Sequence, residues 1–493
     1  MIQVVVRWGS VKSVAATSAF IEQLSRPLLN ILKRHGRSTL QRAIAALLLS
    51  ALAPMTASAI PAFARKYGLP CSACHEAWPR LNNFGQVFKD TGYQLGNDRD
   101  SPIYNNPAYW PVAMRITPQW HDELNTATAT DQSVTGVQPV STQGFDLSGL
   151  DLLAAGTLSK NISFLLTPSA DVYASFHFES AWVRFDNLLN TSWLNVKMGK
   201  FELDNVISEK RILSLSQNGG LYQIYHYLPY VDQNAFNLLP AAPGEEGVRT
   251  TAFGIGDNQL GIELMGHNRN SYTRYAAAVL SSSDGEVNLP SSHSYDVFLD
   301  ADQGFNLGSL GLQRVGVFSY LGKNPTRYLT QTPPGGVPAP IPGTGYSNEG
   351  FSRTGVFGLF YIKKLDLIPM FTHATDNDDV ALGIPSNDPS LPGIHNPHWN
   401  GRMLESNYLF SQQLVLTARY EDIRNTQQIF SSSKSNLGDL DAETLAVRWY
   451  PFMNARDGLA LHGEYSKVHS IGNSPNGSNQ TTRSGFFGLD FAF

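Results

Sequence analysis

The chain has 493 residues, a formal net charge of −5 and 42% hydrophobic residues. It has no basic cluster, no G-x-x-x-x-G-K-[ST] motif and no H-E-x-x-H motif, so nothing indicates nucleic-acid binding, a P-loop nucleotide site or a zinc protease. The composition therefore leaves membrane, redox and binding functions to be decided by the motifs.

The first segment is expected to be a secretory leader. Residues 43–59 form an apolar stretch that follows three arginines and ends in small residues, which predicts signal-peptide cleavage after Ala59. The apolar core is about ten residues, whereas a membrane-spanning helix needs ~20. Residues 1–59 are thus predicted to direct export, and either an upstream start or an extended leader explains the long stretch before the apolar core.

The pattern C-x-x-C-H at Cys71, Cys74 and His75 contains both cysteines of the chain, and it is the attachment pattern of a c-type haem. Two thiols at this spacing anchor one porphyrin, and the adjacent imidazole ligates the iron. A zinc site needs further ligands, and a thioredoxin-like site belongs in a βαβ pattern, but the flanking residues supply neither. The motif predicts one covalent haem c held by Cys71 and Cys74, with His75 as the metal ligand.

The haem motif lies in a short segment, residues 60–100, that is expected to be a monohaem cytochrome domain. About forty residues is near the size below which a chain needs a metal, a disulfide or a partner to fold. We therefore expect a covering partner for this segment. An apolar stripe at helical spacing after His75 predicts a helix that packs on the core or on the porphyrin edges: Trp78, Leu81, Phe84 and Phe88.

Residues 101–493 have a different sequence pattern from residues 60–100, because apolar and polar residues alternate there with a period of two. Residues 414–421 show the pattern clearly: Leu414, Leu416, Ala418 and Tyr420 face one way, and the residues between them face the other. The same alternation predicts strands at 181–186, 194–198, 445–450, 459–466 and 485–493.

The connections separate a membrane barrel from a soluble sandwich. Short links, such as 187–192, 363–366 and 451–458, alternate with long links rich in Gly, Pro, Asn and Ser. The long links include 322–350, 375–400, 424–441 and 469–484. Short turns on one rim and long loops on the other are typical of outer-membrane barrels. The last strand ends in an aromatic residue, Phe493, and resembles the recognition strand of such barrels.

The chain is therefore predicted to be all-β, with a transmembrane antiparallel barrel whose lumen is plugged by a short α-helical haem segment. About 24 residues per strand and its connection give ~16 strands. A barrel of that size leaves an aqueous lumen. The polar residues of the strands are expected to be ordinary solvated residues of this lumen: Arg184, Lys197, Arg419, Arg448, His462 and Glu464.

The residues around the haem motif resemble a known family. Residues 61–75 read P-x-F-A-R-x-Y-G-x-x-C-x-x-C-H, and residues 79–93 read P-x-L-N-x-F-G-x-x-F-K-x-x-G-Y. Joined to a barrel, this pattern resembles the fused outer-membrane cytochrome c-porins, known best as iron oxidases of iron-oxidising bacteria. The resemblance implies a haem-bearing plug that takes electrons from extracellular Fe(II) and passes them to a periplasmic c-type cytochrome.

Three functions stay open at this point. The first is an electron conduit through the outer membrane, with Fe(II) or another donor and a periplasmic cytochrome or another acceptor. The second is a passive porin whose haem has a structural or sensing role. The third is a haem enzyme, such as a peroxidase, which needs an open iron position and a nearby acid or base that the segment does not offer.

Two further sites are left open by the sequence. The second axial ligand of the iron has Met114 and His121 as its nearest candidates and His177 and His462 as lumenal ones. A methionine would raise the potential relative to histidine. An acidic loop could attract cations, although a solvated loop is the expected reading of these residues: Asp376, Asp378 and Asp379.

Overall fold

A computed structural model describes most of the chain that follows the leader. The described residues are 61–77, 80–96, 100, 102–103, 111–129, 137–170, 176–204, 258–281, 295–326, 330–331, 339–340, 347–375, 396, 398–427, 438–453, 458–471 and 478–492. Ala57–Phe493 form one compact unit. The predicted leader, its cleavage after Ala59 and the acidic loop at 376–379 lie outside the described residues. Among the described helices, none is long and apolar enough to cross a membrane.

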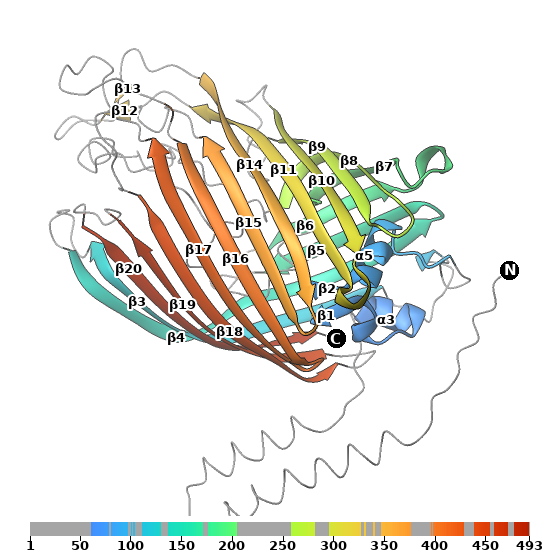
Figure 1. Cartoon of the computed structure of the whole chain (residues 1–493), viewed down its shortest axis with the longest axis horizontal. Coiled ribbons are helices and arrows are strands. Elements are labelled where there is room, and N and C mark those ends of the chain that lie inside the picture. The colour runs from blue at the N-terminus through green and yellow to red at the C-terminus, as the bar shows by residue number, and fades with distance from the viewer. Residues whose placement is uncertain are drawn as a thin grey trace, which may run out of the picture. The chain divides into compact units, whose positions relative to one another are not determined.

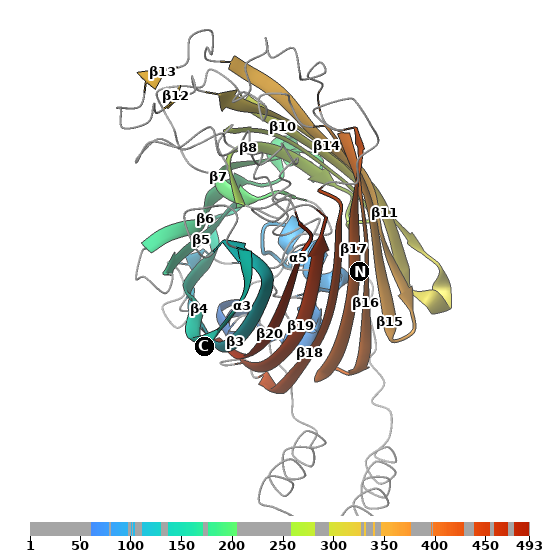
Figure 2. The ribbon, with the colours of Figure 1, turned by 90° about the vertical axis from the view of Figure 1, so that its left-hand side faces the viewer.

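Sixteen antiparallel strands form a closed barrel (Figures 1 and 2), which confirms the predicted strand number. Each strand pairs with its neighbours in chain order, and the last strand pairs with the first to close the ring. The strands are β3 (Val112–Ala129), β4 (Val137–Ser159), β5 (Ile162–Ala170), β6 (Phe176–Phe185), β7 (Asn195–Glu202), β8 (Asn258–His267), β9 (Thr273–Ser281), β10 (Tyr295–Asn306), β11 (Leu312–Thr326), β14 (Ser347–Ile362), β15 (Leu365–Thr375), β16 (His398–Ser411), β17 (Leu414–Gln427), β18 (Leu440–Met453), β19 (Gly458–Ser470) and β20 (Gln480–Ala492).

The period-two pattern predicts the two faces of the wall correctly. In β17, Leu416 and Tyr420 point outward and are 41% and 46% exposed, whereas Arg419 and Glu421 point inward and are 4% and 1% exposed. The predicted last strand behaves in the same way, because Phe487 of β20 is 60% exposed on the outside and pairs with Trp120 of β3. An apolar exterior and a polar interior are the arrangement of barrels that span a lipid bilayer.

The connections sort onto two rims, as the sequence predicts. Short turns include the 3₁₀ turns η3 (Leu188–Asn190) and η5 (Gly308–Leu310) and a two-residue link between β14 and β15. Several of these turns need the left-handed backbone region, which Asn161 and Lys363 adopt with φ of 62° and 59°. We call this end of the barrel the short-turn rim. Within the long link between β11 and β14, two short strands pair with each other, β12 (Thr330–Gln331) and β13 (Ala339–Pro340).

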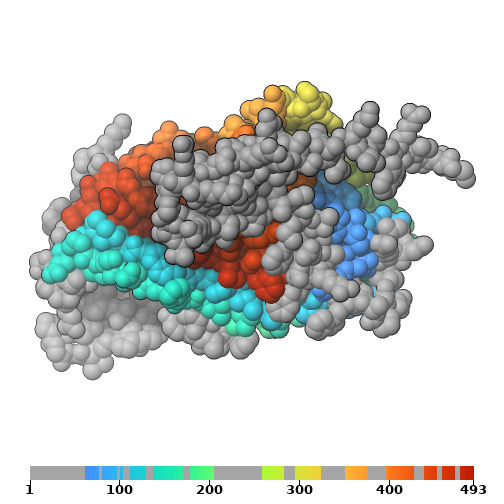
Figure 3. Space-filling view, turned by 90° about the horizontal axis from the view of Figure 1, so that it is seen from below, coloured from blue at the N-terminus to red at the C-terminus, as the bar shows by residue number. Residues whose placement is uncertain are grey.

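The N-terminal segment lies against the inner wall at the short-turn rim. It consists of α3 (Pro61–Tyr67), α4 (Cys71–Cys74), β1 (His75–Ala77), β2 (Arg80–Leu81) and α5 (Asn83–Asp90), drawn in blue in Figures 1 and 2. In the space-filling view, blue atoms of the segment reach the molecular surface at one end of the barrel (Figure 3).

The prediction that the apolar stripe after His75 forms a single helix is wrong. Leu81 lies in β2, and the helix starts only at Asn83, so Phe84 and Phe88 alone share it. Pro79 provides the reason, since proline disfavours helical backbone before it and removes a hydrogen-bond donor. Phe84 and Phe88 lie one turn apart on the same face of α5, and their burial differs along it, because Phe88 is 6% exposed and Phe84 is 42% exposed.

An aromatic cluster forms the core of the segment and continues into the barrel wall. Phe63 of α3 contacts Phe88 of α5 and Tyr93, with ring centroids 5.2 and 4.7 Å apart. Tyr67 contacts Phe88 at 5.3 Å, and Tyr93 stacks on Trp182 of β6 at 6.3 Å. The barrel therefore supplies part of the core that a forty-residue segment lacks, as the size argument predicts.

Candidate functional site

The C-x-x-C-H motif forms one tight turn followed by a short strand. Helix α4 places positions 71 and 74 three residues apart on one helical face, and His75 begins β1 directly after it. Cys74 and His75 are each 8% exposed, and His75 pairs with Leu81 of β2. The side chain of Cys71 lies outside the described part of the structure. The backbone thus presents two thiol positions and an adjacent imidazole together, which fits the donor set of a c-type haem.

Asn82 clamps this turn. Its backbone N–H donates to the Cys74 carbonyl at 2.9 Å, and its side-chain amide donates to the carbonyls of Ser72 and Ala73 at 3.3 and 3.0 Å. Its Oδ1 accepts from the Gly85 N–H at 2.9 Å and so caps α5. One side chain therefore starts α5 and holds the haem-motif turn against it.

Gly85 allows the two helices to approach this closely. A Cβ at this position would lie 2.2 Å from the Cys74 carbonyl oxygen and 3.0 Å from a methyl carbon of Leu81. Backbone atoms cannot move aside as the end of a flexible side chain can, so only glycine fits here. Sequence reasoning quoted Asn82 and Gly85 in the family pattern without a role. Their spacing of three, which is that of an N-cap and the backbone N–H that donates to its side chain, was the available signal.

The Cys74 thiol is free and buried in the structure. Burial raises the pKa of this thiol to about 11. A reactive dithiol site depends on a lowered thiol pKa, so this environment does not fit a thioredoxin-like site. In the described part of the chain, no group of three or more His, Cys, Asp or Glu residues is arranged to hold a metal ion.

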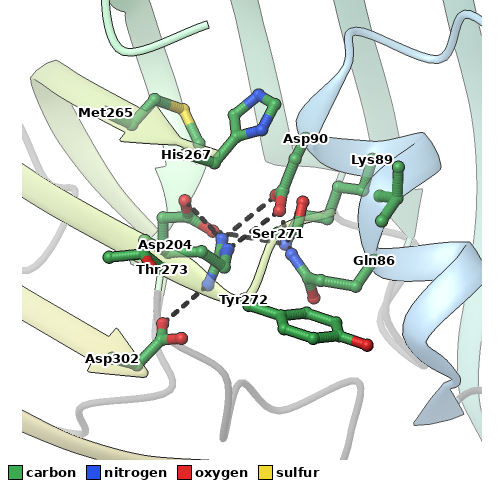
Figure 4. Close-up of polar contacts among 12 residues, drawn as sticks. Gln86, Lys89, Asp90, Asp204, Met265, His267, Ser271, Tyr272, Thr273 and Asp302 are labelled. Carbon is green, nitrogen blue, oxygen red and sulfur yellow. Dashed lines mark hydrogen bonds and ion pairs between the residues drawn. The ribbon is translucent and has the colours of Figure 1, made fainter. Parts of the chain in front are cut away.

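A buried ionic cluster ties α5 to the barrel (Figure 4). Both oxygens of the Asp90 carboxylate accept from Arg274 of β9, at 2.9 and 3.1 Å. The same guanidinium bonds Asp204, which follows β7, at 2.9 Å and Asp302 of β10 at 3.1 Å. Burial alone would raise the pKa of the Asp90 carboxyl, but Arg274 outweighs it and holds that pKa below its usual value. Arg274 therefore joins the segment to three strands of the wall.

Other contacts hold the segment at several points around the rim. Arg80, 1% exposed, pairs with Asp366 of β15 directly after a short turn. Arg184 of β6 donates to the Lys89 carbonyl at 2.7 Å, and Arg65 of α3 donates to the carbonyl of Val112 at the start of β3 at 2.7 Å. The partners come from widely separated strands, so the segment is fixed across the opening of the short-turn rim.

The predicted lumenal residues face inward, but the expectation that they are solvated is wrong. All six are at most 5% exposed; the four basic residues each pair with a carboxylate, and His462 contacts Glu464. The period of the sequence reports which face a residue occupies, whereas packing inside the lumen decides whether water reaches it. The pairs are Arg184–Asp186 (2.6 Å), Lys197–Glu263 (2.5 Å), Arg419–Glu421 (3.1 Å), Arg448–Asp490 (3.1 Å) and His462–Glu464 (2.8 Å).

The structure removes one of the four candidates for the second axial ligand. Met114 pairs with Leu152, which is 42% exposed, while the adjacent Arg115 turns inward to Asp490. Since paired residues share a face, Met114 points to the outside of the barrel and cannot reach a haem inside it.

The three histidines stay predictions. His121 lies 2.8 Å from Asp146, and His462 is buried with its Nε2 2.8 Å from Glu464. The side chain of His177 lies outside the described part.

No protein-family model matches the chain, and no curated protein matches it. The chain is similar to several solved outer-membrane proteins over about three quarters of its length. An anion-selective porin from Comamonas acidovorans is 11% identical, with 78% of this chain and 99% of that chain covered and a TM-score of 0.46. The channel DcaP of Acinetobacter baumannii is 8% identical, with 76% and 96% covered and a TM-score of 0.45. OmpT of Vibrio cholerae, folded in vitro, is 11% identical, with 77% and 100% covered and a TM-score of 0.42.

Proposed function

We propose that the protein is an outer-membrane electron-transfer protein in which one c-type haem, attached at Cys71 and Cys74 and ligated by His75, is held in the opening of the barrel. One observation carries the proposal: the haem-motif turn, clamped by Asn82, belongs to a segment that buried ion pairs fix to the inner wall. A segment fixed in this way holds a redox group in the opening of the barrel.

The outer surface supports the membrane location. Large apolar side chains are exposed on the outside of many strands, whereas buried ion pairs such as Arg184–Asp186 and Arg419–Glu421 lie on the inner face. Such an exterior is unstable in water and stable in lipid. Exposed outward residues include Leu299, Val317, Val356, Leu404, Leu445 and Phe487.

The proposed chemistry is one-electron transfer, which haem c supplies by the change of iron between its ferric and ferrous states. His75 holds the iron from one side, and Cys71 and Cys74 hold the porphyrin. Asn82 fixes the turn that carries these three residues. Because short turns face the periplasm in outer-membrane barrels, the segment lies on the side where a periplasmic cytochrome would accept electrons. We propose extracellular Fe(II) as the donor on the basis of the family resemblance.

The inner wall favours a conduit over a passive porin. Porin lumens are polar and filled with water. Here the inward rows of β10, β11 and β14–β16 are rich in apolar and aromatic side chains that are at most 6% exposed. These residues are Phe298, Phe318, Tyr320, Phe351, Phe357, Met370, Trp399 and Met403.

The test is electron transfer across a sealed bilayer. The full protein is inserted into liposomes that contain an oxidised c-type cytochrome, and Fe(II) is added outside. We expect reduction of the internal cytochrome, and we expect none with the Cys71→Ser/Cys74→Ser variant, whose barrel insertion is checked separately. Haem reduction without reduction inside would refute the conduit. Conductance of solutes in planar bilayers by the haem-loaded wild type would favour the porin, and reduction by donors other than Fe(II) alone would refute the iron assignment.

A further inference from the structure

A charged cluster lies on the outer wall beyond the apolar band. It consists of Arg402 in β16, Asp422 and Arg424 in β17, and Asp441 in β18, which we call the outer arginine cluster. Each of these residues alternates with buried inward residues, so all four point to the outside. They lie in the halves of these strands that are farther from the short turns at 412–413 and 454–457.

The acids lie beneath the arginines. The Oδ2 atom of Asp422 accepts from the Nη2 and Nε of Arg402 at 2.7 and 3.1 Å, and the Nε of Arg424 lies 3.8 Å from the same oxygen. Arg424 also pairs with Asp441, which accepts from the Tyr420 hydroxyl at 2.9 Å. The Asp422 side chain is 7% exposed, whereas the Arg402 side chain is 62% exposed. The carboxylate is therefore covered, and the guanidinium forms the surface.

The cluster begins where the apolar band ends. On the side of the short-turn rim, the next outward residues are Leu404 in β16 and Tyr420 in β17, which are 45% and 46% exposed, whereas in β18 the exposed Glu443 precedes Leu445, which is 61% exposed. Aromatic residues such as Tyr420 mark the boundary between lipid chains and headgroups on barrels, and long loops face the outside of the cell. The cluster thus lies at the level of the outer-leaflet headgroups, on the proposed outer-membrane location.

We propose that the outer arginine cluster binds a phosphate group of an outer-leaflet lipid headgroup. Guanidinium groups bind phosphate through paired N–H donors, and a carboxylate that holds one edge of the group orients the other. Arg402 supplies the exposed cation, with its side chain 62% exposed, while Arg424 is held by Asp441 and by the carbonyl oxygens of Ile423 and Leu440 at 3.0 and 2.9 Å. On the same outer face, Lys467 of β19 pairs in register with Glu443 and Arg483, which adds one net positive charge beside the cluster.

The proposal is tested by native mass spectrometry of the full protein in detergent. The probe is bisphosphoryl lipid A, with monophosphoryl lipid A as the comparator. The Arg402→Gln/Arg424→Gln variant removes the cluster's cations, and Lys160→Gln/Lys364→Gln removes two cations from the short-turn rim as a matched control. Because a hydrogen bond to a charged group contributes about 1.5–3 kcal/mol, we expect at least about a tenfold weaker affinity for the cluster variant and an unchanged affinity for the control.

The remaining outcomes are also decisive. Equal affinity of wild type and cluster variant would overturn the proposal, and so would an equal loss in the control, which would indicate unspecific charge attraction. Displacement of the lipid by an equal concentration of inorganic phosphate would assign the cluster to free anions instead. If the glutamine variant fails to fold, Arg402→Lys/Arg424→Lys keeps the charge without the planar donors and must bind more weakly than wild type. Electron transfer and membrane fractionation of the same variants report separately on the proposed function.

Discussion

Replacement of Asp90 by asparagine is expected to loosen the N-terminal segment without opening the barrel. The substitution removes the charge that holds α5 to Arg274 but leaves Arg274 its bonds to Asp204 and Asp302. The two bonds that Asp90 accepts from Arg274 are 2.9 and 3.1 Å long, and the residue is 1% exposed, so solvent hardly screens them; the third bond, from Gln86 at 2.7 Å, lies within α5.

The magnitude follows from these contacts. Hydrogen bonds to charged groups contribute about 1.5–3 kcal/mol each, and asparagine keeps one acceptor oxygen. A loss of about 2–3 kcal/mol from the attachment of the segment is therefore expected. It corresponds to a detached population about 30-fold to 150-fold larger, since 1.4 kcal/mol is a factor of ten.

Trypsin cleavage after Lys89 measures this population. The Lys89 carbonyl accepts from Arg184 at 2.7 Å, so a protease reaches the bond only after the segment has left the wall. We expect faster cleavage in Asp90→Asn by the factor above. Asp490→Asn is the matched control, because Asp490 is equally buried and pairs with the wall residues Arg115 and Arg448. Equal cleavage rates in Asp90→Asn and wild type would show that the Arg274 cluster does not hold the segment.

Three further results are expected. Gly85→Ala places a Cβ 2.2 Å from the Cys74 carbonyl oxygen and should lower the amount of covalent haem per protein, as measured by haem staining. Full haem content in this variant would contradict the role of the close α4–α5 contact in haem attachment. Met114→Ala should leave the optical spectrum and midpoint potential unchanged because Met114 points outward, whereas His75→Ala should alter both. Because the pKa of Asp90 is lowered on folding, its contribution is complete above about pH 4 and lost as the pH falls through the folded value. Trypsin is inactive there, so pepsin cleavage should rise on acidification in wild type and change less in Asp90→Asn.

The barrel could be predicted because the sequence pattern that specifies it is local. In a strand with one face toward lipid, apolar and polar residues alternate with a period of two, and each strand shows this alternation independently of the others. The alternation at 414–421 therefore predicted both the strand and its two faces, and the lengths of the links predicted the two rims.

The haem site stays a prediction of the sequence, and its support could not be predicted. C-x-x-C-H predicts the attachment and ligand residues because their spacing lies within one turn of chain. In the sequence, Asn82 belongs to the family pattern, but nothing there indicates that it holds the haem-motif turn. Nothing in the sequence marks Asp90 as the partner of Arg274, because the two residues are 184 positions apart and only the closed sheet brings them together.

The sequence by itself thus determined the strand number, the two faces of the wall and the two rims, since each depends on neighbours along the chain, and it predicts the three haem-motif residues. Tertiary structure alone decided that the lumenal charges are buried pairs, that Met114 faces outward and that the segment is fixed at the short-turn rim. These properties depend on which strands become neighbours and on what fills the lumen, and the register of the closed barrel settles both.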